Sequence, residues 1–229
     1  MRSRLARSRQ GPHGHAHDRE ARRESGGSAA VGLLERLIFL SDGVFAIAMT
    51  LLVVELAVPQ ISTPSAGDEL GPQLLALYPK YLSYAISFVV IASYWTSHQR
   101  IFSYIVRADG RLVWLNILLL LCIAFQPFPT SVLGTYGTTA AVTFYAATLA
   151  MTGLVVLTLW VYATRHRRLV SPELESRLVE HHTVRAACVP LVFAISIGIA
   201  QTNPTAAEFS WLAIAVLIGV LRWRYRDSG

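Results

Sequence analysis

Long apolar runs alternate with short polar stretches along this chain. A membrane-spanning helix needs about 17–25 mostly apolar residues, because each residue advances about 1.5 Å and the hydrocarbon layer is about 30 Å thick. Six runs satisfy this requirement, and the breaks between them are rich in Gly, Pro and polar residues. The runs lie at about residues 37–58, 78–102, 112–133, 139–164, 184–202 and 208–224. The pattern therefore predicts an all-α integral membrane protein with six transmembrane helices.

The first 30 residues differ from the rest of the chain. Residues 1–30 are rich in Arg, His, Gly and Ser and contain almost no large apolar side chain, which is typical of a disordered segment. We predict a disordered basic cytoplasmic tail there, followed by a single six-span domain over residues 31–226. His13, His15 and His17 alternate within this tail, but in a flexible basic segment we predict no metal site.

Positive side chains determine the predicted orientation. All of the 20 Lys and Arg residues except Lys80 lie in four segments: the first 36 residues, 100–111, 165–185 and the residues after 221. With six spans these segments share one side of the membrane, and cationic residues collect on the cytoplasmic side. Both termini are therefore predicted to be cytoplasmic, in a multi-pass protein of the cell inner (plasma) membrane. The formal net charge of +6 then requires no nucleic-acid partner.

Composition narrows the classes of function. Hydrophobic residues make up 53% of the chain and charged residues only 15%, a balance typical of membrane proteins rather than soluble domains. Cys122 and Cys188 both fall within apolar runs, so we interpret them as small buried side chains and not as a disulfide or metal site. The sequence contains no recognisable catalytic motif, and the chain is not expected to be an enzyme.

Polar and charged residues recur near the predicted cytoplasmic ends of the first three helices. The set comprises Arg36, Ser41 and Asp42 on the first helix, Trp95, His98 and Gln99 on the second, and Trp114 and Asn116 on the third. Taken singly, Arg36 and His98 could extend to the membrane surface. Asp42 lies more than a helical turn inside, where a carboxylate needs partners. We therefore predict a polar network that joins the three helices.

The same residues form three short motifs. The chain reads R-L-I-F-L-S-D from Arg36 to Asp42, W-T-S-H from Trp95 to His98, and W-L-N from Trp114 to Asn116, before a run of leucines. In type and order these motifs resemble the R-x-x-x-F-S-D, W-x-x-H and W-L-N motifs of the transmembrane protein 175 family. The resemblance covers roughly residues 36–130. Leu40 stands at the phenylalanine position of the first motif, with Phe39 one place earlier.

This resemblance implies a function and an assembly. Members of the family are cation channels selective for potassium, so the chain is expected to conduct K⁺ passively, with the ion as cargo and no bound cofactor. One six-helix repeat per chain implies a homotetramer around a central pore that the first helix lines. The polar network would then tether that helix to the second and third helices. The expected partners are other copies of the chain, potassium ions and the lipid bilayer.

One face of the first helix carries an apolar stripe. Ile47, Leu51 and Val54 share this face, with Thr50 beside them. Asp42 lies about 140° away from Ile47, so it is expected to point toward neighbouring helices. Taken alone, such a stripe most often serves packing. The resemblance instead implies that these residues project into the pore as hydrophobic rings, which gate by losing water, with a hydroxyl at position 50.

Three other features bear on function. Glu55, near the outer end of the first helix, either attracts cations to the pore mouth or is a solvated helix-end residue. Residues 134–137 read G-T-Y-G, but they lie in a short outer turn and are interpreted as a tight turn rather than a potassium filter. His181 and His182 are expected to face water in an inner loop, where they could also sense pH.

Two alternatives to a channel stay open. A secondary ion transporter would be expected to show internal inverted repeats and helices broken at mid-membrane, and the sequence pattern indicates neither. The composition also fits a non-conducting membrane protein or a membrane enzyme, although nothing polar enough for catalysis is expected at mid-depth.

Overall fold

The computed structural model describes residues 12–61 and 66–211, and this part of the chain is helical apart from turns and one isolated β-bridge. The helices are α1 (Pro12–Val54), α2 (Ala66–Ala76), α3 (Tyr78–Tyr104), α4 (Gly110–Phe125), α5 (Pro127–Tyr136), α6 (Thr139–Thr164), the 3₁₀ turn η2 (Arg165–Arg167), α7 (Ser176–Ala200) and α8 (Pro204–Ser210). The all-helical class expected from the hydropathy pattern is therefore confirmed.

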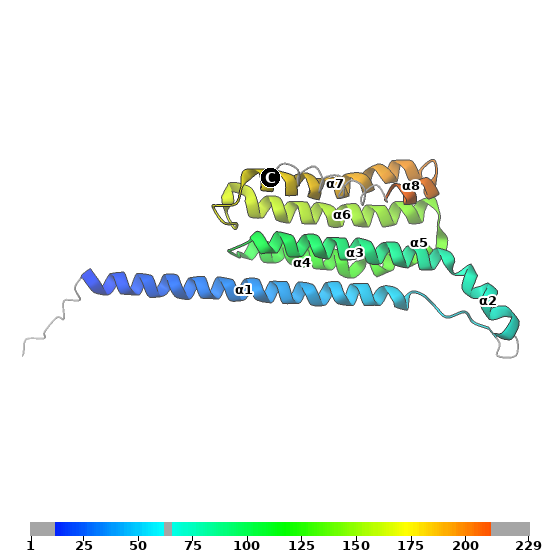
Figure 1. The fold of residues 1–229 in the computed structure, drawn as a ribbon, viewed down its shortest axis with the longest axis horizontal. Coiled ribbons are helices and arrows are strands. Elements are labelled where there is room, and N and C mark those ends of the chain that lie inside the picture. Colours follow the sequence, from blue (N-terminus) through cyan, green and yellow to red (C-terminus); the bar gives the residue numbers. More distant parts are fainter. Residues whose placement is uncertain (1–11, 62–65, 212–229) are drawn as a thin grey trace, which may run out of the picture.

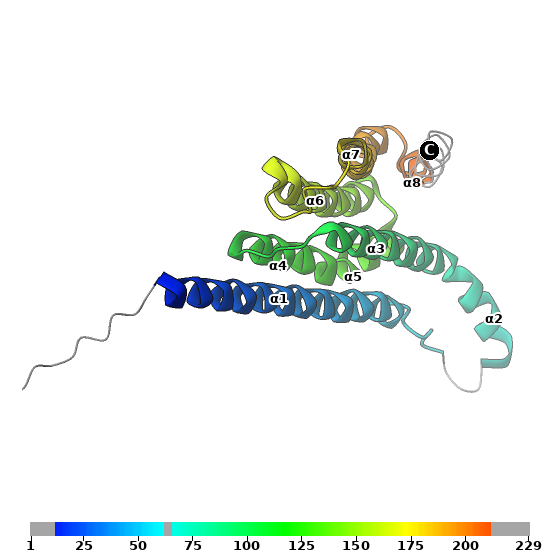
Figure 2. The same ribbon diagram turned by 60° about the vertical axis from the view of Figure 1, so that its left-hand side comes forward.

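The helices run side by side in three layers (Figure 1). Helix α1 lies along one edge and packs against α3, α4 and α5 in the middle layer. Helices α6, α7 and α8 form the layer on the other side, with α6 in contact with α4 and α5. The turned view in Figure 2 shows the same order. One long face of α1 is consequently left uncovered by the other described helices.

Four described helices are long and apolar enough to cross a membrane: Val31–Val54, Gly110–Tyr136, Thr139–Arg167 and Ser176–Ala200. A fifth span results if Gly67–Ala76 and Tyr78–Tyr104, which meet at 45°, are counted as one bent span. The predicted sixth span at 208–224 lies outside the described residues from 212 onward, and α8 covers only its beginning.

Several boundaries differ from those expected. Helix α1 begins at Pro12, inside the tail predicted to be disordered, where Ala, Arg and Glu favour helix. It ends at Val54 rather than near residue 58. Helix α2 lies in the predicted outer loop, and its first turn carries Asp68 and Glu69, which suit a helix N-terminus. Helix α6 covers the same residues as the helix expected there.

Two further differences concern proline and the inner loop. The third predicted helix is divided between α4 and α5 at Gln126, because Pro127 has no N–H to bond the preceding turn. Helix α7 begins at Ser176, eight residues before the expected start at 184. His181 and His182 therefore lie on a helix and are half-buried, so the prediction of a solvent-facing loop pair is wrong. Their rings approach one another at 5.4 Å between centroids.

The loops at one end of the bundle are joined through Asp109, which precedes α4. Its carboxylate accepts hydrogen bonds from the Leu112 N–H at 2.9 Å and from the Tyr162 hydroxyl at 2.5 Å, and lies 3.5 Å from Arg168 Nε. Desolvation alone would raise the pKa of the Asp109 carboxyl, but the hydrogen bonds and Arg168 outweigh it and hold that pKa below its ordinary value. Two segments rich in cations thus lie at the same end of the bundle.

Helices α6 and α7 pack closely where Gly153 of α6 faces Pro190 of α7. A Cβ atom at position 153 would lie 2.9 Å from Pro190 Cδ, so one helix would have to shift. We expect Gly153→Ala to lower the free energy of unfolding by about 1–3 kcal/mol, measured by thermal unfolding of the purified protein in detergent. Gly198→Ala is the matched control, because nothing lies within 4 Å of a Cβ there. Equal stabilities of the two variants would contradict this packing account.

Candidate functional site

Helix α1 has two faces of different character. Its buried residues recur every three or four positions, at the spacing that one face of an α-helix requires. They are Leu37, Ser41, Phe45, Ala48 and Leu52. Because α1 contacts α3, α4 and α5, this face fixes the rotation of the helix about its own axis.

A second face of α1, turned about 115° from the buried face, is apolar and uncovered by the other described helices. Ile47 is 59% exposed, Leu51 44% and Val54 71%, and the neighbouring Thr50 is also exposed. The Thr50 hydroxyl donates to the Ile47 carbonyl of its own helix at 2.9 Å, so its oxygen can still act as an acceptor. Glu55 follows the last residue of α1 and is half-buried. The stripe expected from the sequence thus lies on the surface of the described part of the chain, uncovered by any other described helix.

On the buried face, Ser41, His98 and Asn116 form what we term the inner polar cluster. Asn116 Oδ1 lies 2.9 Å from His98 Nε2, and Asn116 Nδ2 donates to Ser41 Oγ at 3.0 Å. All three residues are buried, and the His98 ring stacks on Phe102 at 4.1 Å between centroids. The other ring nitrogen, Nδ1, has no hydrogen-bond partner among the described residues. This cluster joins α1, α3 and α4, three helices of the predicted network.

Asp42 lies beside this cluster and has different partners. Its Oδ1 accepts hydrogen bonds from Trp95 Nε1 at 2.8 Å and from Gln99 Nε2. Trp95 and Gln99 are four residues apart and therefore share one face of α3. Asp42 is half-buried and lies at the edge of the α1–α3 contact. Its carboxylate therefore has two uncharged hydrogen-bond donors and no cationic partner among the described residues.

Two predicted members do not join this network. Arg36 is exposed and makes no hydrogen bond or ion pair with any described residue, because six positions place it about 120° around the helix from Asp42. Trp114 is 71% exposed, because two positions place it about 160° from Asn116. Both residues match the family's motifs, but neither contacts the polar residues within this chain.

A second polar group lies deep in the bundle and was not singled out from the sequence. The Tyr145 hydroxyl lies 2.8 Å from Ser87 Oγ, which accepts a bond from Thr130 Oγ1 at 2.8 Å. Gln126 Nε2 donates to Thr152 Oγ1 at 3.1 Å, and Gln126 Oε1 has no partner among the described residues. Single hydroxyl side chains are common in transmembrane helices, so they do not mark a buried polar group in the sequence. Gln126, beside a proline, was the one residue of this group that the sequence could have indicated. These bonds hold α3, α5 and α6 together.

Within the described residues, no group of three or more His, Cys, Asp or Glu side chains could hold a metal ion. The polar groups described above are instead hydrogen-bonded pairs and triads between helices. Their arrangement can position α1, but it contains no nucleophile paired with a base.

The chain is similar to known ion channels. The family model described as endosomal/lysosomal potassium channel TMEM175 matches residues 36–127. A potassium channel of Streptomyces collinus is 34% identical over 170 residues, which cover 72% of this chain and 81% of that protein. A potassium channel of Chamaesiphon minutus is 33% identical over 185 residues, which cover 79% of this chain and 88% of that protein.

The fold is also similar to a solved structure. The crystal structure of a lysosomal potassium-selective channel TMEM175 homolog from Chamaesiphon minutus matches with a TM-score of 0.72 at 30% identity. The match covers 82% of this chain and 97% of that chain. The part matched by the family model runs from Arg36 in α1 to Pro127 at the start of α5, and it contains the inner polar cluster.

Proposed function

Since this chain belongs to the TMEM175 family of ion channels, we propose that it conducts potassium ions passively and selectively across a membrane. It is a multi-pass, all-helical membrane protein, and its family consists of channels rather than enzymes. The observation that carries the proposal is the apolar, uncovered face of α1, which is separate from the face held by buried polar contacts.

The pore in this proposal is formed by α1 from four chains. A central axis beside the uncovered face would bring four copies of Ile47, Leu51 and Val54 together as successive rings. An aliphatic ring offers an ion no ligand to replace its hydration shell. When such a ring is narrow, water leaves the constriction and ions do not pass. The exposed Thr50 hydroxyl would contribute a polar group between the rings.

The inner polar cluster supports this arrangement by holding α1 in one rotation. A rotation of about 100° would move the next residue onto the axis, and it would break the bonds of Ser41 and Asn116. Asp42 reinforces the same orientation through Trp95 and Gln99. The polar residues are therefore assigned to positioning the pore helix and not to binding the ion.

A secondary ion transporter is the second candidate, and one observation favours it. The structure contains the helix break at Gln126 and the 45° bend between α2 and α3, whereas the sequence pattern indicated no broken helix. Broken helices are frequent in transporters, where they line the substrate site. In this chain, however, Gln126 is buried and bonded to Thr152.

Reconstitution into liposomes distinguishes the two candidates. Purified protein is placed in vesicles with a K⁺ gradient, and current and internal pH are recorded together. A channel gives a current that reverses near the K⁺ equilibrium potential without stoichiometric proton movement. A fixed ratio of H⁺ to K⁺ would establish a transporter, and no K⁺ flux above that of empty vesicles would exclude both.

Orientation is tested by labelling single cysteines in a chain whose Cys122 and Cys188 are replaced by serine. We expect Thr138→Cys to react with an impermeant thiol reagent applied outside intact cells. Glu173→Cys should react only after the cells are permeabilised. Both side chains are exposed, so accessibility in the single chain is matched. The reason for the expected difference is the cationic character of the 165–185 segment. Labelling of Glu173→Cys from outside would contradict cytoplasmic termini.

A further inference from the structure

Two charged residues near the predicted outer ends of the helices have no part in the proposed pore. Lys80 is the one Lys or Arg outside the four cationic segments, and it is also the only lysine of the chain. Glu55 follows the last residue of α1, where the sequence allowed either a cation-attracting or a solvated role. The structure brings these two residues to the same place.

Glu55 and Lys80 line a small cavity between one end of α1, the start of α3 and α5. Its volume of about 10 Å³ is close to the space that one water molecule occupies. Thr130, Ser131 and Thr135 of α5 line it as well and carry hydroxyl groups. A buried water needs two to four polar partners, and this wall can supply them. Glu55 and Lys80 are the only charged residues among the described ones that line the cavity.

Neither charge is fully exposed to water or directly paired. Both side chains are half-buried, and no ion pair joins them directly within the described ranges. The α3 backbone is held at the cavity by a close approach of α5, because a Cβ atom at Gly134 would lie 3.2 Å from Lys80 Cα. Burying a charge without an opposite charge is costly. Opposite charges on the wall of a water-sized cavity are therefore expected to interact through a water molecule.

Each charge also stands at the unfavourable end of its own helix. The carbonyl end of a helix carries partial negative charge, and the amino end carries partial positive charge. Glu55 comes directly after the last residue of α1, and Lys80 is the third residue of α3. Across the cavity, the carboxylate faces the amino end of α3 and the ammonium faces the carbonyl end of α1. Pairing thus compensates an unfavourable charge on both helices.

We propose that Glu55 and Lys80 form a water-bridged ion pair that fastens this end of α1 to α3. Hydroxyls of Ser131 and Thr135 hydrogen-bond the bridging water. The pair is a positioning contact additional to the inner polar cluster, because Ser41 of that cluster lies about 21 Å earlier along the helix axis. It also cancels the charge of Glu55, which therefore does not attract cations to the pore mouth. The assignment of α1 to the pore rests on the proposed function, whereas the contact between the two helices does not.

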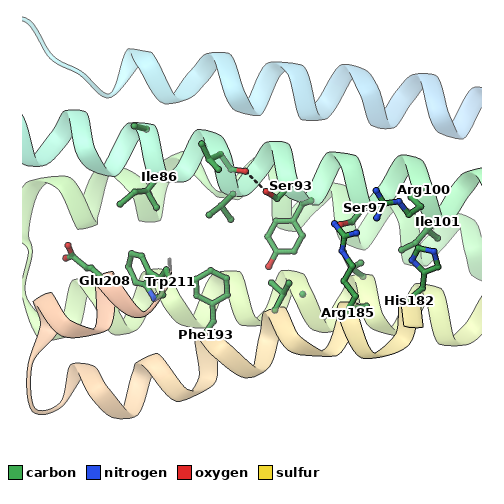
Figure 3. A pocket seen from close by; sticks show the side chains of 18 residues that line it. Ile86, Ser93, Ser97, Arg100, Ile101, His182, Arg185, Phe193, Glu208 and Trp211 are labelled. Carbon is green, nitrogen blue, oxygen red and sulfur yellow. Dashed lines mark hydrogen bonds between the residues drawn. The ribbon is translucent and has the colours of Figure 1, made fainter. Parts of the chain in front are cut away.

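The pair is separate from a much larger cavity of the molecule. That cavity, of about 350 Å³, is lined by Ile86 from α3 and Phe193 from α7, among others (Figure 3). The two cavities share no lining residue within the described part of the chain. Substitutions of Glu55 and Lys80 therefore leave the lining of the larger cavity unchanged.

A double-mutant cycle tests the pair by thermal unfolding of the purified full-length protein in detergent. We expect Glu55→Gln and Lys80→Gln each to lower the thermal midpoint by about 2–4 °C. The double variant should lose less than either single variant, because it leaves no unpaired charge. Lys80→Arg should keep the midpoint, and so should Glu173→Gln, which removes the same charge from an exposed loop.

Without a pair, each single glutamine variant would instead keep or raise the midpoint, because it relieves repulsion between the charge and the dipole of its own helix. That result, or losses that add up in the double variant, would overturn the proposal.

Amine labelling gives a second measurement, because Lys80 is the only lysine of the chain. An amine-reactive ester is added to the protein in detergent, and the modification of Lys80 is followed by mass spectrometry. We expect Glu55→Gln to raise the labelling rate about fivefold, because the lysine side chain is then free to leave the cavity. Glu173→Gln should not change this rate.

Equal labelling rates for the unaltered protein and Glu55→Gln would contradict the pair. Since neither experiment records current, failure of this proposal leaves the channel proposal unaffected.

Discussion

Replacing Ile47 by asparagine is expected to raise single-channel conductance several-fold and to weaken the preference for K⁺ over Na⁺. Ile47 is 59% exposed on the uncovered face of α1, so the change removes little packing within one chain. In the proposed assembly we expect Ile47 to form the narrowest ring, and the change places four amides there. Amide oxygens can replace part of an ion's hydration shell, which an aliphatic ring cannot do. The energy barrier to both K⁺ and Na⁺ therefore falls.

Met151→Asn provides the matched control for this variant. Met151 is 56% exposed on α6, in the layer farthest from α1, and the substitution brings the same change in polarity. Its conductance and reversal potential should equal those of the unaltered protein, measured by single-channel recording with K⁺ and Na⁺ on opposite sides. Unchanged recordings for Ile47→Asn would remove this residue from the pore.

Met49→Asn separates the two faces of α1. Met49 lies about 160° from both Ile47 and Leu51, and it is partly buried against the hydrophobic core. An amide there displaces core packing, so the expected result is less assembled protein rather than altered selectivity. Size-exclusion chromatography in detergent checks this expectation, and a normally assembled Met49→Asn channel with altered selectivity would contradict the assigned faces.

Replacing Asn116 by leucine is expected to have the largest effect on assembly. Asn116 is fully buried, and its removal leaves His98 with no partner at either ring nitrogen among the described residues. A buried polar group left unpaired costs about 1–3 kcal/mol, and each of the four chains in the proposed assembly would bear this cost. The thermal midpoint of the purified oligomer should fall, and α1 should lose its fixed rotation.

Trp114→Leu is the control within the same motif. Trp114 is 71% exposed and takes no part in the inner polar cluster, so its replacement should change stability by no more than about 0.5 kcal/mol. If the two variants shift the thermal midpoint equally, the cluster does not hold α1.

Periodicity along α1 predicted that Ile47, Leu51 and Val54 share one face, and the buried residues do occupy a different one. Periodicity alone favoured packing for that stripe, and only the resemblance implied that it projects away from the neighbouring helices. The same arithmetic could have excluded Arg36 and Trp114 from the polar network, because each lies on a different face from its neighbour in the motif. Similar depth in the membrane is not sufficient for contact between side chains, because contact also requires that they point toward one another.

Other features depended on interactions that periodicity does not record. The break at Gln126 follows from Pro127, but the apolar run reads as continuous through Pro127 and Pro129. The early start of α7 places His182 against Trp160, with ring centroids 5.5 Å apart. That contact comes from tertiary packing of a polar segment, which hydropathy assigns to a loop.

Cadmium block of a cysteine introduced at position 47 tests the central claim, that α1 lines the pore, most directly. The variant is Ile47→Cys in a chain whose Cys122 and Cys188 are replaced by serine, and the control is Met151→Cys in the same background. Four thiolates around one axis form a soft-ligand site for Cd²⁺. The account predicts that low Cd²⁺ concentrations block current through Ile47→Cys, that a chelator restores it, and that Met151→Cys is unaffected. Undiminished K⁺ current through Ile47→Cys in saturating Cd²⁺ would contradict it.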